Sequence, residues 1–399
     1  MVIIKTKSPW IKDIKIKAVD IVDREFSGNT PPTVFVGSKL YPKANVGILS
    51  PLENKEEAKK YDDPIMWYNE GYGIKKIFEL RSNLINSRFK AHVLDVKKDS
   101  KFLELAQEIA MAFKPTNIEV ELQKKLAPSF KVDQFHMPFG PSGEIHKIKA
   151  TENISLQKNV EKIFYDTDLK AVDSIKYLNS KGINENELSQ LLSIGIMGVK
   201  ADRKLVPTRW SITATDDILG KEIIKEIKYN NLIHNYKLHF GNYLGNYYLI
   251  FFFPESWSYE LFESAMPDFL SHKDQMIYTS TDYENYYGRK NYADNTVGGY
   301  YAARLSVLEY LKNLKIQGSA LLLRFVTNEY SVPLGVFVVR QAVRKTLSTN
   351  AFEFDNKKLM FEYGRKIIMD KFGYDINNLL KNSKLLEIIN NQTKLNKFF

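Results

Sequence analysis

The chain has 399 residues, of which 57 are lysine or arginine and 47 are aspartate or glutamate, so its formal net charge is +10. Hydrophobic residues make up 44% and charged residues 26%, which excludes a disordered chain, a collagen and a coiled-coil array. The basic balance favours anionic partners such as nucleic acid, and it carries no information about the fold.

Cysteine is absent, which excludes disulfides, thiolate zinc sites, iron–sulfur clusters and thiol catalysis. The first ten residues, MVIIKTKSPW, hold no apolar core long enough for a signal peptide. The longest apolar run, from Tyr247 to Phe253, is far shorter than the roughly 20 residues of a membrane span. We therefore expect a cytoplasmic protein without a membrane partner.

Hydrophobic periodicity predicts the elements of the first half of the chain. Alternation favours a strand over residues 14–22, and two short strands, Val34–Val36 and Val46–Leu49, lie in a stretch rich in glycine and proline. Ser100 is expected to cap one helix, and Gly195 is expected to end another. The predicted amphipathic helices cover residues 72–86, 102–113, 155–165, 168–179 and 185–194.

The second half predicts more helices and a hairpin. One helix is expected to begin at Thr215 or Asp216, and a hairpin over residues 232–240 and 243–253 is expected to turn at Gly241-Asn242. Helices over 257–266, 299–315, 357–370 and 375–389 alternate with strands over 319–327 and 334–340. This mixture predicts an α+β fold of mixed, largely antiparallel sheets with packed helices, and it allows two lobes. We expect a body over residues 1–388, with a boundary near residue 150, and a flexible tail over 389–399.

The last eight residues, QTKLNKFF, match the sliding-clamp-binding box Q-x-x-(I/L/M)-x-x-(F/Y)-(F/Y) at every defined position. A single 3₁₀ turn would place Leu395 and Phe398 on one side, with Phe399 beside them. Gln392 can donate and accept hydrogen bonds through its amide, and buried aromatic anchors dominate the energy of such interfaces. The alternative is that the tail folds back onto its own domain; we favour clamp binding.

The segment LVPTRWSITATDD, from Leu205 to Asp217, concentrates polar and aromatic residues. Arg209 beside Trp210 could hold a phosphate and stack a base, and Ser211 or Thr213 could orient a reacting group. Asp216 and Asp217 could ligate magnesium or act as a base. The structural alternative is that Thr215 or Asp216 caps a helix whose dipole the two carboxylates complement.

Gly37, Ser38 and Lys39 follow a short apolar run and precede Lys43. Backbone N–H groups beside lysine could form a phosphate-binding nest, although the Walker A pattern is missing. The alternative is a simple hairpin corner.

The segment DYENYYGRKNY interleaves tyrosines with basic residues. Tyr286, Tyr287, Arg289 and Lys290 could therefore stack on and neutralise single-stranded nucleic acid. A tyrosine-rich surface loop without a ligand is the alternative.

Taken together, these segments resemble the archaeal Nre family of DNA repair proteins. The matching stretches run in order across most of the chain: PPTVFVGSKLYPKANVGILSP, RKLVPTRWSITATDD, VGGYYAARLSVLEYL, VPLGVFVVRQAVRKTL and the terminal QTKLNKFF. The resemblance implies a role in archaeal DNA damage repair, and it implies that Gln392, Leu395, Phe398 and Phe399 dock on the sliding clamp PCNA. Some members carry an N-terminal cysteine cluster typical of a zinc module; this chain has no cysteine, so no such zinc site is expected.

Two hypotheses of function follow. The first is a repair factor that binds DNA, is recruited by PCNA and is associated with the nucleoid when it is bound to the clamp. The second is a clamp-tethered DNA-modifying enzyme, which would use the RWSITATDD segment for magnesium-dependent phosphodiester cleavage or for ADP-ribosyl transfer from NAD. A pure adaptor between the clamp and another protein is a third class. The sequence leaves open whether the protein is an enzyme.

Overall fold

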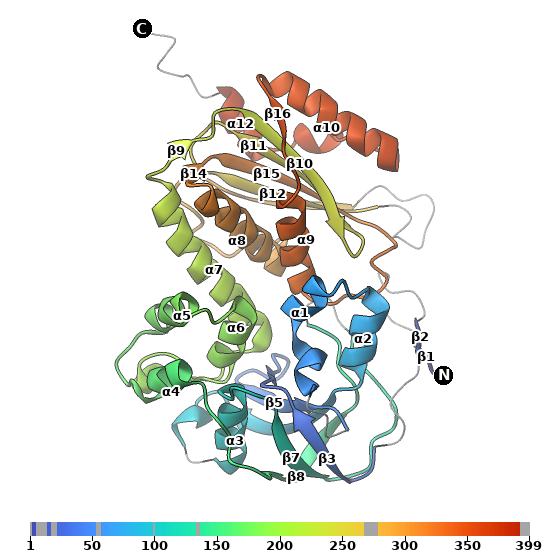
Figure 1. Cartoon of the computed structure of the whole chain (residues 1–399), viewed down its shortest axis with the longest axis vertical. Coiled ribbons are helices and arrows are strands. Elements are labelled where there is room, and N and C mark those ends of the chain that lie inside the picture. Colours follow the sequence, from blue (N-terminus) through green and yellow to red (C-terminus); the bar gives the residue numbers. More distant parts are fainter. Residues whose placement is uncertain are drawn as a thin grey trace. The chain divides into compact units, whose positions relative to one another are not determined.

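The computed structural model of the chain describes residues 2–4, 14–16, 22–52, 57–98, 100–132, 136–266 and 278–391. The chain divides into two compact units, whose elements are labelled in Figure 1. Unit 1 comprises Met1–Leu219 with Ser331–Gly335, and unit 2 comprises Gly220–Tyr330 with Val336–Phe399. The division falls within helix α7 (Thr208–Ile227), whereas the boundary suggested near residue 150 lies inside unit 1.

Unit 1 contains a mixed sheet with the strand order β3-β7-β8-β6-β5-β4. Only the β6–β8 pair of this described sheet is parallel. The strands are β3 (Glu25–Thr30), β4 (Val34–Val36), β5 (Lys43–Ser50), β6 (Ile85–His92), β7 (Thr116–Leu122) and β8 (Ser142–Ala150), beside a separate short pair, β1 (Val2–Ile4) and β2 (Ile14–Ile16). The helices before α7 are α1 (Pro64–Asn69), α2 (Ile74–Ser82), α3 (Lys101–Ala110), α4 (Lys158–Tyr165), α5 (Ala171–Ser180) and α6 (Glu185–Ser193), with 3₁₀ turns η1 (Ala58–Asp62), η2 (Asp95–Lys97) and η3 (Lys200–Asp202).

Unit 2 contains a second mixed sheet with the order β13-β12-β15-β11-β10-β16. In it β12 and β15 are parallel, and the other described neighbours are antiparallel. Helices α8 (Val297–Asn313) and α9 (Phe337–Leu347) cover one face, and α10 (Lys357–Phe372) and α12 (Lys384–Asn391) cover the other (Figure 1). The strands are β10 (Tyr236–Tyr243), β11 (Asn246–Phe253), β12 (Tyr259–Ala265), β13 (Tyr278–Glu284), β15 (Ser319–Val326) and β16 (Phe352–Phe354), beside a short parallel pair, β9 (Asn231–Leu232) and β14 (Ile316–Gln317); α11 (Asn377–Leu380) precedes α12.

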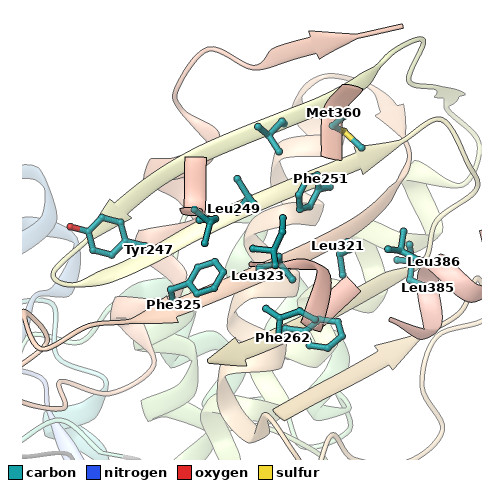
Figure 2. Packing of buried hydrophobic residues seen from close by; sticks show 14 of the residues in the cluster. Tyr247, Leu249, Phe251, Phe262, Leu321, Leu323, Phe325, Met360, Leu385 and Leu386 are labelled. Carbon is teal, nitrogen blue, oxygen red and sulfur yellow. The ribbon is translucent and has the colours of Figure 1, made fainter. Parts of the chain in front are cut away.

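The hydrophobic core of unit 2 lies between its sheet and helices α10 to α12. All eight residues of β11 are buried, because this central strand is covered on both faces. Figure 2 shows the alternate residues of β11 and β15 pointing toward the side chains of α10 and α12. The labelled members are Tyr247, Leu249, Phe251, Phe262, Leu321, Leu323, Phe325, Met360, Leu385 and Leu386.

The opposite face of this sheet carries buried charge. Arg304 of α8 donates to Glu284 over 2.8 Å, and both side chains are almost fully buried. Trp257 donates from its indole nitrogen to the same carboxylate. A buried ion pair of this kind costs desolvation and is kept only where hydrogen bonds satisfy it, so the VGGYYAARLSVLEYL segment has a structural role in this sheet.

The α+β class predicted from the sequence is confirmed. Helices were correctly expected near α3 to α6, α8 and α10, with boundaries that differ by a few residues. The expected helix over 72–86 ends earlier, at Ser82, because β6 begins at Ile85. Ser100 stands at the N-cap of α3 without a capping hydrogen bond from its side chain, and Gly195 does follow α6, at a φ of 75°.

Two assignments in the second half are wrong. The expected helix over 257–266 is strand β12, and the expected strand over 334–340 is largely the start of helix α9. Both elements are buried on more than one side, so neither has the polar face that gives a clear period. The hairpin turns at Leu244-Gly245 and not at Gly241-Asn242, with φ of 49° and 74°, as a two-residue turn of positive φ requires.

The expected helix over 375–389 is divided into α11 and α12. The break occurs at Ser383, whose hydroxyl accepts from Leu386 N. The buried carboxylate of Glu260, on β12, accepts from Ser383 Oγ and from the amides of Lys384 and Leu385. Burial raises the pKa of Glu260, and the capping bonds hold the N-terminus of α12 on the sheet. No helix in the described ranges is both long and apolar enough to span a membrane.

Candidate nucleic-acid interface

The Gly37–Lys39 segment forms the corner of the β4–β5 hairpin. Gly37 N donates to Asn45 O over 2.9 Å, and Tyr41 N donates to Ser38 O over 3.2 Å. The amide of Gly37 is thus used by the hairpin and does not form part of a phosphate nest. Lys39 and Lys43 are exposed at the corner.

Helix α7 begins directly after Pro207. Trp210 N and Ser211 N both donate to Pro207 O, and a proline beside the first helical residue favours helix initiation because its φ is already helical. Thr208 Oγ1 accepts from Val36 N over 2.9 Å. That hydrogen bond holds the first turn of α7 beside the end of β4, so the structure brings two separate candidate segments together within unit 1.

Trp210 and Tyr41 meet at this junction. Their ring centroids lie 5.0 Å apart with planes inclined at 59°, a distance typical of favourable aromatic pairs. The exposed fractions are 45% for Trp210 and 46% for Tyr41, and neighbouring Leu40 is 55% exposed. Arg209 is half-buried next to Trp210. The result is an exposed aromatic pair at a hairpin corner that also carries two exposed lysines. These residues, Lys39, Leu40, Tyr41, Lys43 and Trp210, are here called the Tyr41–Trp210 surface.

The sequence predicted Trp210 and Lys39 as candidate binding residues but did not indicate Tyr41. The available signal was weak: Tyr41 follows Leu40 in a glycine- and proline-rich stretch, which predicts a turn with exposed residues. The contact with Trp210 depends on tertiary structure, which no local pattern reveals.

The rest of the RWSITATDD segment lies inside helix α7. The prediction that the helix begins at Thr215 or Asp216 is wrong, because α7 starts at Thr208. Thr215 and Asp216 therefore cannot be N-caps; both are fully buried in the middle of the helix. Ser211 Oγ donates to Thr208 O and Thr213 Oγ1 to Arg209 O, the back-bonding usual for such residues inside helices. Asp217 is half-buried.

No group of three or more His, Asp or Glu side chains in the described ranges is arranged to hold a metal ion. Asp216 and Asp217 lie within these ranges.

The tyrosine-rich loop belongs to unit 2 and follows β13. Tyr287 is 88% exposed, and Tyr286 contacts it edge to face at 5.5 Å. Lys228, just after α7, places its ammonium 4.1 Å from the centre of the Tyr286 ring. The next residue, Tyr229, is 92% exposed. This loop thus gains a basic residue, Lys228, from the segment that follows α7, a connection that the sequence did not reveal.

Arg289 has a structural position in the same loop. Its guanidinium donates to the carbonyl oxygens of Tyr283, Asn291 and Tyr292 and pairs with Asp282 at 3.1 Å. Those bonds hold the loop closed, whereas Lys290 is exposed. The residues predicted to bind the sliding clamp, Gln392, Leu395, Phe398 and Phe399, lie outside the described residues.

Comparison with known proteins shows the family to which the chain belongs. The sequence model described as "Archaeal Nre, N-terminal" matches residues 7–270, and that described as "Archaeal Nre, C-terminal" matches residues 284–398. The chain belongs to the archaeal Nre family.

Three relatives are similar over most of their length. "DNA repair protein NreB" of Archaeoglobus fulgidus is 37% identical over 335 residues, which are 84% of this chain and 83% of the relative. "DNA repair protein NreA" of Haloferax volcanii is 34% identical, covering 79% and 77%, and "DNA repair protein NreA" of A. fulgidus is 35% identical, covering 88% and 85%. No solved structure matches the chain.

Proposed function

We propose that this protein acts in DNA repair, that its body binds DNA, and that the sliding clamp PCNA recruits it through the tail QTKLNKFF. The names of the relatives support a repair role. The full match of the tail to the clamp-binding box supports recruitment. A clamp-tethered protein acts at high effective concentration on DNA, so modest affinity of the body for DNA suffices.

The Tyr41–Trp210 surface carries the DNA-binding part of the proposal. Large aromatic rings exposed side by side offer a platform on which an unpaired base can stack, and such stacking is tolerant of sequence. Lys39 and Lys43 stand where they can neutralise the phosphates of the same strand. Single-stranded or locally unpaired DNA is therefore the substrate class that this surface fits.

The tyrosine-rich loop supports the same function from unit 2. Tyr286 and Tyr287 present rings beside Lys228 and Lys290, a combination that suits a second contact with a single strand. We propose it as an auxiliary contact, since Arg289 is engaged within the loop.

The test is DNA affinity by fluorescence anisotropy with a labelled single strand. Stacking on an aromatic residue contributes about 1–3 kcal/mol per base, so Trp210→Ala should weaken binding roughly 10-fold. Tyr165→Ala is the matched control, because Tyr165 is 69% exposed in the same unit but stands on α4. Equal affinities of the Trp210→Ala variant and the wild type would show that DNA is bound elsewhere or not at all.

A further inference from the structure

One face of the unit 1 sheet carries basic side chains on strands β5 and β6. The antiparallel register pairs Lys43 with His92, Asn45 with Lys90, and Gly47 with Arg88. Residues directly opposite each other in such a pair point to the same face of the sheet. Same-face neighbours along one strand lie roughly 6.7 Å apart, so each cation can contact a different phosphate. Lys43, Arg88 and Lys90 are here called the β5–β6 face.

This side of the sheet is buried at one end and open at the other. On β5, Leu49 belongs to a small hydrophobic cluster, whereas Lys43 is exposed. On β6, Asn86 is buried, Arg88 is half-buried and Lys90 is exposed. Arg88 therefore stands at the border between the core and solvent.

Arg88 makes no ion pair or hydrogen bond with any described residue. Other arginines of unit 1 are paired, Arg24 with Glu121 and Arg81 with Asp62. The Nε atom of Arg88 is closed to solvent, whereas its two terminal nitrogens are not among the buried atoms that lack a partner. The guanidinium can therefore be reached from outside.

A half-buried guanidinium without a counter-ion is unfavourable, because it loses hydration and gains no partner. Its planar fork of N–H donors matches two oxygens of one anion, and phosphate presents such a pair. Arg88 is thus suited to hold a phosphate group at the surface.

The carboxylate opposite Arg88 is engaged elsewhere. Glu144 of β8 stands opposite Arg88 in the parallel β6–β8 pair, but its carboxylate pairs with Lys90 at 3.3 Å. The side chains of Lys90 and Glu144 are 65% and 38% exposed, and an ion pair so open to water is weak. A phosphate can therefore compete with Glu144 for Lys90.

Lys43 belongs both to this face and to the Tyr41–Trp210 surface, because β5 begins at Lys43 directly after the hairpin corner. The two surfaces are therefore continuous. An acidic protein segment would match the cations but has no use for the exposed rings beside them. A polynucleotide uses both, since its bases stack and its phosphates bind cations.

We propose that the β5–β6 face binds the phosphate backbone of a DNA single strand beyond the nucleotide that stacks on the Tyr41–Trp210 surface, with Arg88 holding one phosphate. The inference rests on the proposed function, because one strand occupies both surfaces. It implies that affinity rises with the length of an oligonucleotide until the strand reaches Arg88.

The experiment measures fluorescence anisotropy of labelled oligothymidines of about 4 and about 12 nucleotides with the full chain over a range of salt concentrations. Arg88→Gln should weaken binding of the longer strand roughly 10-fold. It should also lower the slope of log affinity against log salt by about 0.7 and leave the shorter strand unaffected. Arg24→Gln is the matched control, since it removes the same charge from an arginine that Glu121 already neutralises.

Glu144→Gln tests the assignment in the opposite direction. The change releases Lys90 and removes a carboxylate that repels phosphate, so the longer strand should bind roughly 3-fold more tightly. Glu119→Gln is the matched control: it releases Lys149, 2.8 Å away on the same sheet, outside the β5–β6 face. A gain in Glu144→Gln alone would not arise from a merely structural role.

Two results would overturn the inference: an unchanged affinity and salt slope for the longer strand in Arg88→Gln, or no tighter binding in Glu144→Gln than in Glu119→Gln. If Arg88→Gln does not fold, Glu144→Gln decides alone, because its side chain is exposed.

Failure of this inference is distinguishable from failure of the proposed function. Loss of both oligonucleotides in Trp210→Ala, with Arg88→Gln equal to wild type, would refute the β5–β6 face and leave the stacking surface standing. Normal binding in Trp210→Ala, with a weakened longer strand in Arg88→Gln, would refute the stacking surface and retain the phosphate contact. A wild-type chain that binds neither strand would refute both.

Discussion

The rings of Tyr41 and Trp210 contact each other at 5.0 Å between centroids, although one ends a hairpin corner and the other begins helix α7. Each ring remains close to half exposed. The hydrogen bond from Val36 N to Thr208 Oγ1 fixes the backbones that carry them. Two large rings that contact each other and stay this exposed have the geometry that the proposed stacking on an unpaired base requires.

The first prediction concerns the coupling between these two rings. Tyr41→Ala and Trp210→Ala should each weaken single-stranded DNA binding, and the double variant should lose less than the sum of the two free energies. The reason is that residues in contact act on the same base, so their effects are not independent. Anisotropy titrations of the four proteins measure this cycle, and strict additivity would mean that the rings do not share a ligand.

A second prediction concerns Lys39 and Lys43. Replacing both with glutamine should lower the slope of log affinity against log salt for a single strand by about 1.4, since each phosphate contact contributes roughly 0.7. Titrations over a range of salt concentrations give this slope. Lys75→Gln is the control, because Lys75 is exposed on α2 near Glu79. A slope that is unchanged in the double variant would place the phosphates elsewhere.

A helix was predictable from the sequence where its apolar residues recur on one side that packs against a single hydrophobic core. The helix near α3 has Leu103, Ala106, Ile109 and Ala110 buried on one side, which is the period a sequence reveals. Helix α9 has buried residues all along its length, from Phe337 to Leu347, so its run of apolar residues was read as a strand. Strand β12 was mistaken for a helix for a related reason: it too is buried on both faces, and its acidic residues Glu260 and Glu263 are bound by Ser383 and Arg324 and so mark no solvent-facing side.

The sequence indicated single residues of the Tyr41–Trp210 surface but not the surface itself. Trp210 and Lys39 became candidates because an aromatic next to a basic residue, or a glycine-rich turn beside lysine, is a local pattern. Tyr41 was missed because its partner is far along the chain. The prediction that Asp216 caps a helix is wrong. The threonines and serines around Asp216 suggested a loop, whereas the helix begins directly after Pro207.

A third prediction tests the clamp-binding tail. Replacing Phe398 and Phe399 with alanine should weaken PCNA binding by at least roughly 30-fold, since such anchors contribute about 2 kcal/mol or more. Calorimetry with purified clamp measures the loss. The control replaces Lys394 and Asn396, which occupy variable positions of the box. A chain truncated after Asn391 that still binds with full affinity would refute the assignment.

A fourth prediction compares two glycines with positive φ. Gly245 has a φ of 74°, and a Cβ there would lie 2.4 Å from Tyr330 N, whereas Gly182 has a φ of 85° with open space around it. Gly182→Ala should cost about 1–2 kcal/mol from backbone strain alone. Gly245→Ala should cost clearly more, because the backbone of Glu329 and Tyr330, which packs against the β10–β11 turn, would have to move. Urea unfolding of both variants gives the comparison, and equal losses would argue against the tight contact in the β10–β11 turn.

The last prediction concerns acid sensitivity. His239 is buried on β10 with Nε2 3.2 Å from the Tyr310 hydroxyl, and burial lowers its pKa to about 4. Between this value and the ordinary pKa near 6.5, the unfolded chain binds a proton that the folded chain does not. Its contribution to the free energy of unfolding is therefore fully present above pH 6.5 and is lost as the pH falls toward 4. From pH 7 to 4.5 the loss should be about 2 kcal/mol.

His239→Gln should remove that part of the pH dependence, whereas His146→Gln, at an exposed position on β8, should retain it. Urea unfolding at the two pH values decides the matter: equal pH dependence in wild type and His239→Gln would mean that this histidine titrates normally.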